Sequence, residues 1–224
     1  MNIDIIQEVR QNHETVVGWR RSLHQIPELG IELPKTVAFV VEKLTELGIP
    51  CEVYEDCSCV TATIGKGGKC ILLRGDMDAL PVVEESGLEF ASTTELSHAC
   101  GHDFHAAALL GAAKILKAHE AELPGTVKLI FQSGGEVFKG AAGAISHGLM
   151  ENPKVDSAFA THVFAANALG NVLYGKYFCA SVYGFKIRIQ GKGAHGSSPE
   201  NGIDPLIAGA NILLALQEIT AREV

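Results

Sequence analysis

One short segment, Thr126–Gln132, constrains the fold of this chain more than any other. It is almost entirely apolar and follows the turn-forming pair Pro124-Gly125, which is typical of a strand buried on both faces of a parallel sheet. A helix expected over 140–150 and a strand expected over 157–162 come next, giving the alternation of a βαβ unit. We therefore predict an α/β domain with a mixed sheet and helices on both of its faces.

The residues before this segment predict the other elements of the domain. Apolar spacing and turn residues indicate helices over 5–23, 35–47 and 105–119 and strands over 52–54, 60–64 and 70–74. Asp103 is expected to cap the third helix. The turn Gly65-Lys66-Gly67-Gly68 is long enough to join the last two strands as a hairpin. It is not a phosphate loop, because no strand-to-helix lysine-serine pattern follows it.

The chain changes character after Gly170. Alternating residues predict strands over 171–174 and 183–190, and a glycine-rich loop over 191–199 leads to a helix that begins at Asp204-Pro205 and reaches Arg222. Nothing further in the sequence would cover this unit. We therefore place a domain boundary at 178/179, with one domain over 1–178 and the start of an α+β domain over 179–224.

Composition narrows the possible partners and compartments. The net charge of −8 argues against nucleic acid or an anionic membrane as the main partner. No apolar run approaches the roughly 20 residues of a membrane span, and the acidic start of the chain does not resemble a signal peptide. Six cysteines without regular spacing, the Cys57/Cys59 pair included, predict ordinary reduced thiols and a cytoplasmic location.

The stretch His98-Ala99-Cys100-Gly101-His102-Asp103 holds a thiol and imidazoles on one loop. Gly101 lets the backbone curl so that Cys100 and His102 can face one pocket. A thiolate and an imidazole are good ligands for zinc or another borderline divalent ion. The alternative is a buried thiol beside a helix-capping histidine. His98 and His105 flank the pair and are expected to support the ligands from behind or to lie on the helix surface.

Further ligand-type residues follow the ends of three expected strands. Asp76 and Asp78 follow the strand 70–74, at the carboxyl end where α/β sheets place their sites. These carboxylates could orient a ligand imidazole or hold a base, and Asp78 is our candidate for a catalytic role; the alternative is a pair of turn acids before Pro81. Glu136 and His162 end the two following strands and could converge on the same edge, although a lone histidine there is more often structural.

At this point the chain resembles the M20 metallopeptidase-type amidohydrolases, in the branch of N-acyl-amino-acid, hippurate and auxin-conjugate hydrolases. The His-Ala-Cys-Gly-His-Asp box is the most specific element, and the leading helix is weaker evidence. The segments that carry the resemblance are Arg20–Leu29, Arg74–Pro81, His98–His105, Phe131–Ala141, Thr161–Val163 and Gly191–Pro205. They extend over nearly the whole chain.

The resemblance implies a two-ion centre of zinc, manganese, cobalt or nickel. Carried over by position, it implies that Cys100, His102, Glu136 and His162 are the metal ligands, and that a water shared by the ions attacks an amide carbonyl. It also implies that His195, in the glycine-rich loop, stabilises the oxyanion from a lid, and that in dimeric relatives this histidine comes from the partner subunit; the alternative is a surface histidine. On this basis residues 1–178 are the catalytic metal-binding domain and 179–224 are part of a lid or dimerisation domain.

Two departures bear on activity. Relatives carry paired glutamates where this chain has Gly135-Glu136, and the first glutamate is the general base. Loss of a positioned acid–base group typically costs about 10²–10⁴ in rate. Relatives also return from the lid to the catalytic domain with a last metal-binding histidine, whereas this sequence stops at Val224. We therefore expect the apolar face of the helix 204–222 to lack support.

The function that follows is hydrolysis of an N-acyl amino acid, or a related amide, to a carboxylate and a free amino acid, impaired by Gly135. An alternative from another class is a non-catalytic metal- or ligand-binding relative of these hydrolases. A third is a half-protein that completes its fold with another chain. The sequence leaves the acyl group, the amino acid and the metal open.

Overall fold

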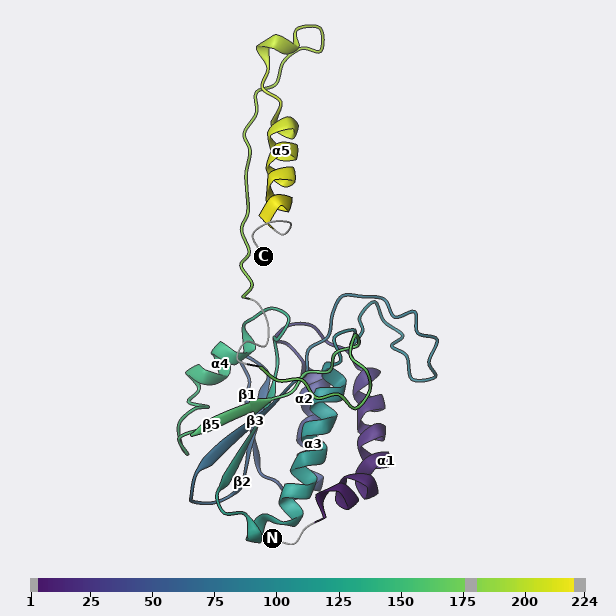
Figure 1. Ribbon diagram of the computed structural model, residues 1–224, viewed down its shortest axis with the longest axis vertical. Coiled ribbons are helices and arrows are strands. Elements are labelled where there is room, and N and C mark those ends of the chain that lie inside the picture. Colours follow the sequence, from purple (N-terminus) through teal and green to yellow (C-terminus); the bar gives the residue numbers. More distant parts are fainter. Residues whose placement is uncertain (1–3, 176–180, 220–224) are drawn as a thin grey trace. The chain divides into compact units, whose positions relative to one another are not determined.

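A computed structural model describes residues 4–175 and 181–219 and contains one five-stranded sheet in that part of the chain (Figure 1). Its strands are β1 (Cys51–Tyr54), β2 (Cys59–Gly65), β3 (Cys70–Asp76), β4 (Thr126–Gln132) and β5 (Ser157–Ala160). The order across the sheet is β1-β2-β4-β3-β5. The pairs β1–β2 and β2–β4 are antiparallel, whereas β3 runs parallel to both β4 and β5. The predicted mixed sheet is confirmed.

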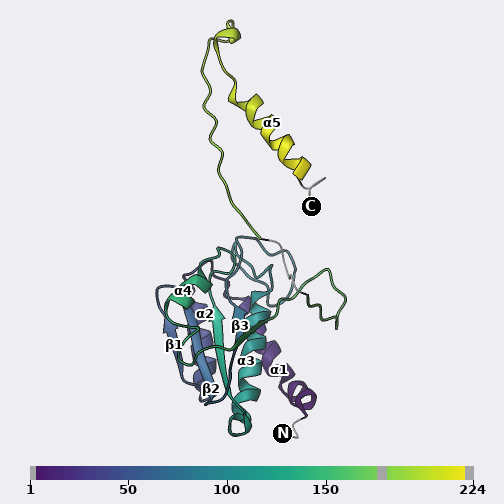
Figure 2. The ribbon, with the colours of Figure 1, turned by 60° about the vertical axis from the view of Figure 1, so that its left-hand side comes forward.

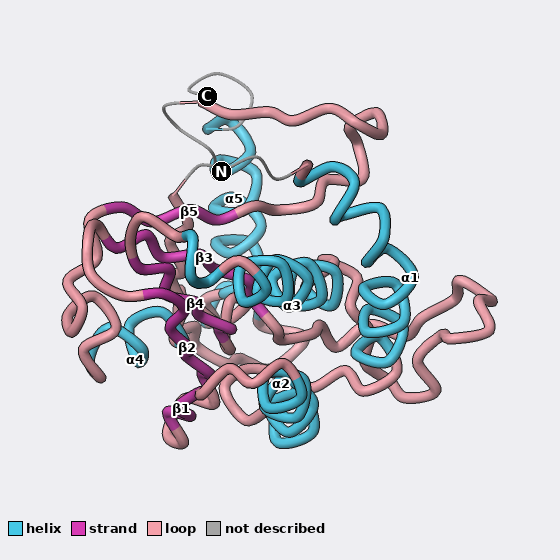
Figure 3. Tube along the Cα trace, turned by 90° about the horizontal axis from the view of Figure 1, so that it is seen from below, coloured by secondary structure: helices cyan, strands magenta, loops and turns pink. Residues whose placement is uncertain are grey.

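Helices cover both faces of this sheet, as expected (Figure 3). The helices are α1 (Ile5–His24), α2 (Pro34–Glu46), α3 (His102–Ala118), α4 (Gly140–Ser146) and, later in the chain, α5 (Pro205–Glu218). The first three lie on one face, where they enclose the larger apolar core, and α4 packs on the other. Figure 2 shows α1 and α3 on the same side of the sheet, and these two helices contact each other extensively.

Strand β4 takes the centre of the sheet because it is buried along its whole length. Phe131 contributes to the core under α1–α3, and its neighbour Ile130 faces the smaller core under α4. The single charge in the strand, Lys128, is buried, and its ammonium group donates to the backbone carbonyls of Leu149, Glu151 and Pro153. These bonds satisfy the buried cation and tie β4 to the connection that follows α4.

The expected hairpin between β2 and β3 is wrong. Strand β4 lies between them, since Val127 pairs with Ile64 on one side and with Ile71 on the other. Hydrophobic spacing identifies strands but not their order in a sheet. The glycines of this turn serve a different purpose: a Cβ on Gly68 would lie 2.9 Å from the Cα of Gly125, so the missing side chain lets the segment entering β4 pass close by.

The parallel strands bring three chain segments to one edge of the sheet. Asp76 pairs with Gln132 and Arg74 with Ala160, so β3, β4 and β5 end side by side. Helix α3 begins at the same edge, and it packs so closely that a Cβ on Gly75 would lie 2.9 Å from a carbonyl oxygen in the first turn of α3. Loops leaving this edge can therefore present side chains to a common place.

The chain forms two compact units, Met1–Ala168 and Leu169–Val224. In the second, α5 begins at Pro205 as predicted, and Asp204 caps it by accepting a hydrogen bond from the backbone of Leu206. The strands expected over 171–174 and 183–190 are wrong, because the described residues form no strand there. Alternation of apolar and polar residues indicates which side of a strand would be buried. It does not show whether another strand lies beside it to form the hydrogen bonds.

Other expectations can be compared with the described residues. No helix among them is long and apolar enough to cross a membrane. Their cysteines are free thiols, in line with the expectation of reduced cysteines, and the sixth, Cys179, lies outside the described residues.

The expectation that Asp103 caps α3 is wrong. Asp103 lies inside the first turn, where Arg20 and His24 bond its carboxylate, and Gly101 is the residue at the cap position.

Candidate metal centre

Three side chains with metal-binding atoms meet at the carboxyl edge of the sheet. Cys100 precedes α3, His102 is its first residue, and His162 follows β5 by two residues. The Sγ atom of Cys100 lies 3.4 Å from Nε2 of His162, and one ligand atom from each of the three residues lies within 4.8 Å of the others. Such a set of one sulfur and two nitrogens suits a borderline divalent cation.

The turn that carries this set depends on Gly101. Its φ of +82° lies in the left-handed region, which favours glycine. A Cβ at this position would also collide with the side chain of Val163, next to His162. The glycine therefore allows both the sharp turn between Cys100 and His102 and the close approach of the segment after β5.

Asp78 fixes the orientation of His102. Its Oδ1 lies 3.2 Å from Nδ1 of the imidazole, which leaves Nε2 turned toward the other candidate ligands. The same carboxylate accepts backbone N–H groups from Gly135 and Glu136, both at 2.9 Å. One buried side chain thus joins the ends of β3 and β4 to the start of α3. A carboxylate behind a ligand imidazole is the usual way in which proteins set its tautomer and direction.

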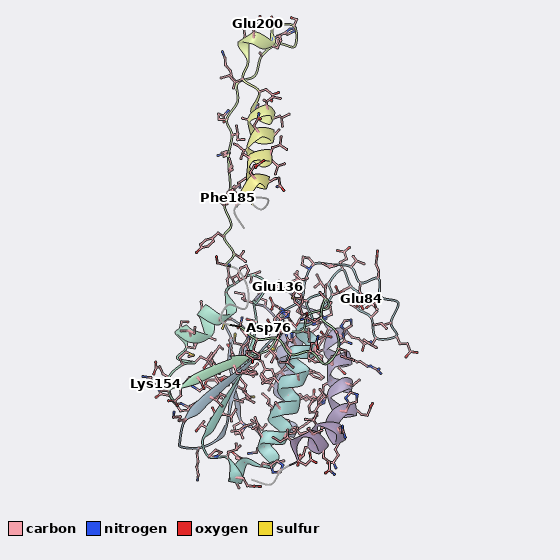
Figure 4. The ribbon with its side chains drawn as sticks, viewed as in Figure 1. Asp76, Glu84, Glu136, Lys154, Phe185 and Glu200 are labelled. Carbon is pink, nitrogen blue, oxygen red and sulfur yellow. The ribbon has the colours of Figure 1, made fainter. Side chains whose placement is uncertain are left out.

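Asp76 forms a second support beside the first. It accepts from Nδ1 of His105 at 2.6 Å and from Arg74 at 2.7 Å. Burial would raise the pKa of this carboxyl, but the His105 hydrogen bond and the charges of Arg74, His102 and His105 outweigh it and hold the pKa at about 2. Asp76 is therefore a fixed anion. Figure 4 shows Asp76 and Glu136 at the same end of the first unit.

His105 was not among the residues predicted for the site itself. It is buried and takes no part in the helix surface: its Nδ1 faces Asp76, and its Nε2 accepts the backbone N–H of Val163 at 2.9 Å. His162 in turn directs Nδ1 to the carbonyl of Val163 at 2.6 Å. Together these bonds leave Nε2 of His162 facing Cys100. The spacing of three residues from His102, which places both imidazoles on one side of a helix, is the signal that could have identified it.

The surroundings of Glu136 fit a cation. Its Oε1 is buried without a hydrogen-bond partner among the described residues, 3.5 Å from Nε2 of His102. Burial raises the pKa of the Cys100 thiol to about 12, and Glu136 and the nearby aspartates add to this increase. A thiolate beside these carboxylates would be costly in a buried place unless a positive charge compensated the negative charges. The donor set and its charge therefore suit a divalent metal.

Gly135 lies close to the side chains of Asp76, Asp78 and His102 but contributes no side chain to the site. A Cβ at this position would lie 3.1 Å from Asp78 Oδ1, 3.2 Å from Asp76 Oδ2 and 3.4 Å from Cε1 of His102. A side chain there would begin against the two carboxylates and the imidazole. Glycine leaves that place without a titratable group.

His195 belongs to the second unit. It is exposed, and its Nδ1 lies 2.9 Å from the hydroxyl of Ser197 in the same loop. Its role as an oxyanion donor stays a prediction.

Comparisons with known proteins agree with one another. The sequence pattern of the peptidase family M20/M25/M40 matches residues 72–216. N-acetyl-L-cysteine deacetylase of Bacillus subtilis (strain 168) is 42% identical over 213 residues, which cover 93% of this chain and 51% of that protein. IAA-amino acid hydrolase ILR1-like 5 of Arabidopsis thaliana is 40% identical over 214 residues, covering 93% and 48%. The chain spans about half the length of these curated relatives.

Solved structures are similar too. A protein from methicillin resistant Staphylococcus aureus matches with a TM-score of 0.81 and 31% identity, covering all of this chain (100%) and 60% of that one. The Bacillus subtilis YxeP protein, described as a dinuclear metal binding peptidase from the M20 family, matches with a TM-score of 0.65 and 36% identity over 68% of this chain and 44% of its own.

Proposed function

Since the chain belongs to the peptidase family M20/M25/M40, we propose that it is a metal-dependent amidohydrolase that cleaves an N-acyl amino acid to a carboxylate and a free amino acid. The observation that carries this proposal is the convergence of Cys100, His102 and His162 at the carboxyl edge of the sheet, with an unpaired oxygen of Glu136 beside them. The substrate class is supported by relatives that are a deacetylase of N-acetyl-L-cysteine and a hydrolase of IAA-amino acids.

Four residues would hold the metal: Cys100, His102, Glu136 and His162. Their nitrogen, sulfur and oxygen donors admit zinc, manganese, cobalt or nickel, and we propose two such ions. When bound, they would polarise the amide carbonyl and activate a water molecule for attack on it. The protein's part is to hold the ligands: Asp78 orients His102, and the carbonyl of Val163 orients His162.

Proton transfer is the step that this chain supports poorly. The attacking water must lose a proton and the leaving amine must gain one, which calls for a group that titrates near neutral pH. Asp76 is a weak base because its pKa is held at about 2, and Asp78 is committed to an imidazole and two backbone N–H groups. Gly135 offers no group. We therefore propose that hydrolysis is impaired at this step.

Substitution at this position tests the proposal. Gly135→Glu should raise the turnover of N-acetyl or N-benzoyl amino acids by about 10²–10⁴, because it adds a carboxylate at the place where a proton acceptor is missing. The two neighbouring aspartates would raise the pKa of the new carboxyl toward neutrality, which suits a base. The new Cβ requires its neighbours to shift by only a few tenths of an ångström.

Gly135→Gln is the matched control, since it has the same size but no titratable group. A gain with glutamate but not glutamine supports the missing base. Equal turnover of the two variants and the parent chain would show that the base has been misplaced.

The rival function is a non-catalytic metal- or ligand-binding relative, and Gly135 is the observation that favours it. Elemental analysis paired with an amidase assay separates the two. Stoichiometric metal with no hydrolysis, before and after Gly135→Glu, would support the rival.

Finer features of the proposal concern the second unit and the setting of the protein. His195 would donate to the oxyanion or to the substrate carboxylate, and the second unit would serve as a lid through which a homodimer forms. A cytoplasmic location is part of the same proposal, on the basis of the free thiols. Loss of turnover with unchanged metal content in His195→Ala, made on the Gly135→Glu background, is the result expected for the lid role.

A further inference from the structure

A buried group of charged residues lies behind the candidate ligands and uses the histidine of the leading helix. His24, the last residue of α1, directs Nδ1 to Asp103 Oδ2 at 2.7 Å and Nε2 to both oxygens of Glu84 at 3.0 Å. Arg20 bonds the same oxygen of Asp103 at 2.7 Å. The side chains of His24, Asp103 and Glu84 are 7%, 0% and 9% exposed. Charges so well buried are kept only where they are paired.

The first connection made by this group is to the turn Cys100-Gly101-His102, called here the ligand turn. Asp103 directly follows His102 in the first turn of α3, so a fixed Asp103 side chain fixes the backbone that carries the imidazole. On the other side of this turn, both ring nitrogens of His98 are buried without a partner among the described residues. Asp103 therefore supports the backbone of the turn, whereas Asp78 orients the His102 ring.

The second connection is to the loop over 81–97, which starts directly after the aspartates at the end of β3. Glu84 also accepts the hydroxyl of Ser86 and the backbone N–H of Ser92, and this closes the loop on itself. Phe90 lies edge-on to the His24 ring, with 5.6 Å between centroids, and the Arg21 guanidinium lies 4.9 Å from the Phe90 centroid. Figure 4 shows Glu84 on this loop.

We propose that His24 is a positioning residue for the metal centre: by bonding Asp103 and Glu84 together, it holds the ligand turn and the 81–97 loop in one arrangement. The inference rests on the proposed function. Arg20, which bonds the same oxygen of Asp103, adds a guanidinium group to this arrangement.

The same two helices provide a matched control at their other ends. His119, which follows α3, lies 2.8 Å from Glu8 in the first turn of α1. This pair also joins a histidine to a carboxylate across α1 and α3, but it does not contact the ligand turn. A variant at His119 therefore loosens the helix pair without touching the proposed positioning group.

The test is metal binding by the full chain, with no need for turnover. Zn²⁺ affinity is measured by competition with a chromophoric chelator, and the Co²⁺ spectrum reports the geometry around the Cys100 thiolate. His24→Gln and Asp103→Asn should lower Zn²⁺ affinity by about 10- to 100-fold, the range for loss of a group that orients a ligand, and should alter the Co²⁺ spectrum. His119→Gln should leave both unchanged.

Each outcome decides the inference. Parent-like affinity and spectrum in His24→Gln, with a loss of thermal stability equal to that of His119→Gln, would reduce the group to a clamp between helices and overturn the positioning role. If His24→Gln does not fold, Glu84→Gln, which loosens only the loop side, should still lower the affinity measurably; no change there overturns the inference. A parent chain that binds neither ion would overturn the proposed function as well, whereas binding without hydrolysis leaves the positioning role standing.

Discussion

Two places in the first unit gather a cysteine, a histidine and a third ligand-type residue within the same distance of one another. The strand-end cluster consists of Cys100, His102 and His162, and the turn cluster consists of Asp56, Cys57 and His147. In the strand-end cluster, Asp78 and the carbonyl of Val163 bond the Nδ1 atoms of the two imidazoles, so that Nε2 of His162 faces Cys100 and Nε2 of His102 faces Glu136. In the turn cluster, Nε2 of His147 is already bonded to Asp56 at 2.7 Å.

The difference lies in what stands behind the ligand atoms. His147 and Asp56 are exposed, and the His147 ring stacks on the buried Tyr54 with 4.6 Å between the ring centroids. The strand-end cluster is backed by buried carboxylates and faces the unpaired oxygen of Glu136. Ligand types at close range are therefore not enough to indicate a metal centre. The groups that orient them separate a prepared site from a chance gathering.

The largest effect should come from removing one thiol from each cluster. Cys100→Ala should lower Zn²⁺ affinity by more than about 100-fold, because it deletes a ligand and not merely a support. Cys57→Ala should leave the affinity and the stoichiometry unchanged. Both are measured by chelator competition and elemental analysis of the purified chain. Loss of one equivalent of metal in Cys57→Ala would erase the distinction between the clusters.

The next effect concerns the carboxylate in each place. Asp78→Asn should weaken Zn²⁺ binding by about 10- to 100-fold, since the amide can still fill the space but no longer favours a ligating tautomer of His102. Asp56→Asn should have no effect on binding. Titration calorimetry with Zn²⁺ gives both values, and equal affinities for Asp78→Asn and the parent chain would contradict the orienting role.

The pH dependence should reveal which thiol binds. Burial raises the pKa of both Cys100 and Cys57 to about 12, so each holds its proton at neutral pH in the metal-free chain. Metal binds the thiolate and must displace that proton, so Zn²⁺ affinity should fall about tenfold for each unit by which the pH is lowered. The slope should persist in Cys57→Ala and flatten in Cys100→Ala. A slope that follows Cys57 would assign the metal to the turn cluster.

The smallest effect is on stability. His147→Ala removes an exposed ion pair and one ring contact, and should lower the free energy of unfolding by about 1 kcal/mol or less. Denaturant unfolding of the metal-free chain measures this change. A much larger loss would mean that the turn cluster supports the core under α4 more than its exposure indicates.

Much of this arrangement could be predicted from local patterns. Buried Thr126–Gln132 reads as a central strand, and acids after β3 together with the Cys100-Gly101-His102 turn indicate a site at the strand ends. What could not be predicted depends on residues far apart in the chain. Asp103 suits a helix cap by its position, but its partners lie 79 and more residues earlier, in α1. Strand order also escaped prediction, because Val127 pairs with both Ile64 and Ile71.

The position of β5 at the edge of the sheet affects how much of the time the candidate metal centre is complete. The strand is four residues long, is exposed along its length and, within the described part of the chain, bonds the rest of the sheet only through β3. His162 is the one candidate ligand that arrives on it. Because short edge elements open before the core does, fraying of these few residues would disconnect a ligand while β2, β3 and β4 stayed intact. A bound cation would hold His162 and so stabilise β5 against opening. Metal occupancy and the order of this sheet edge should therefore increase and decrease together.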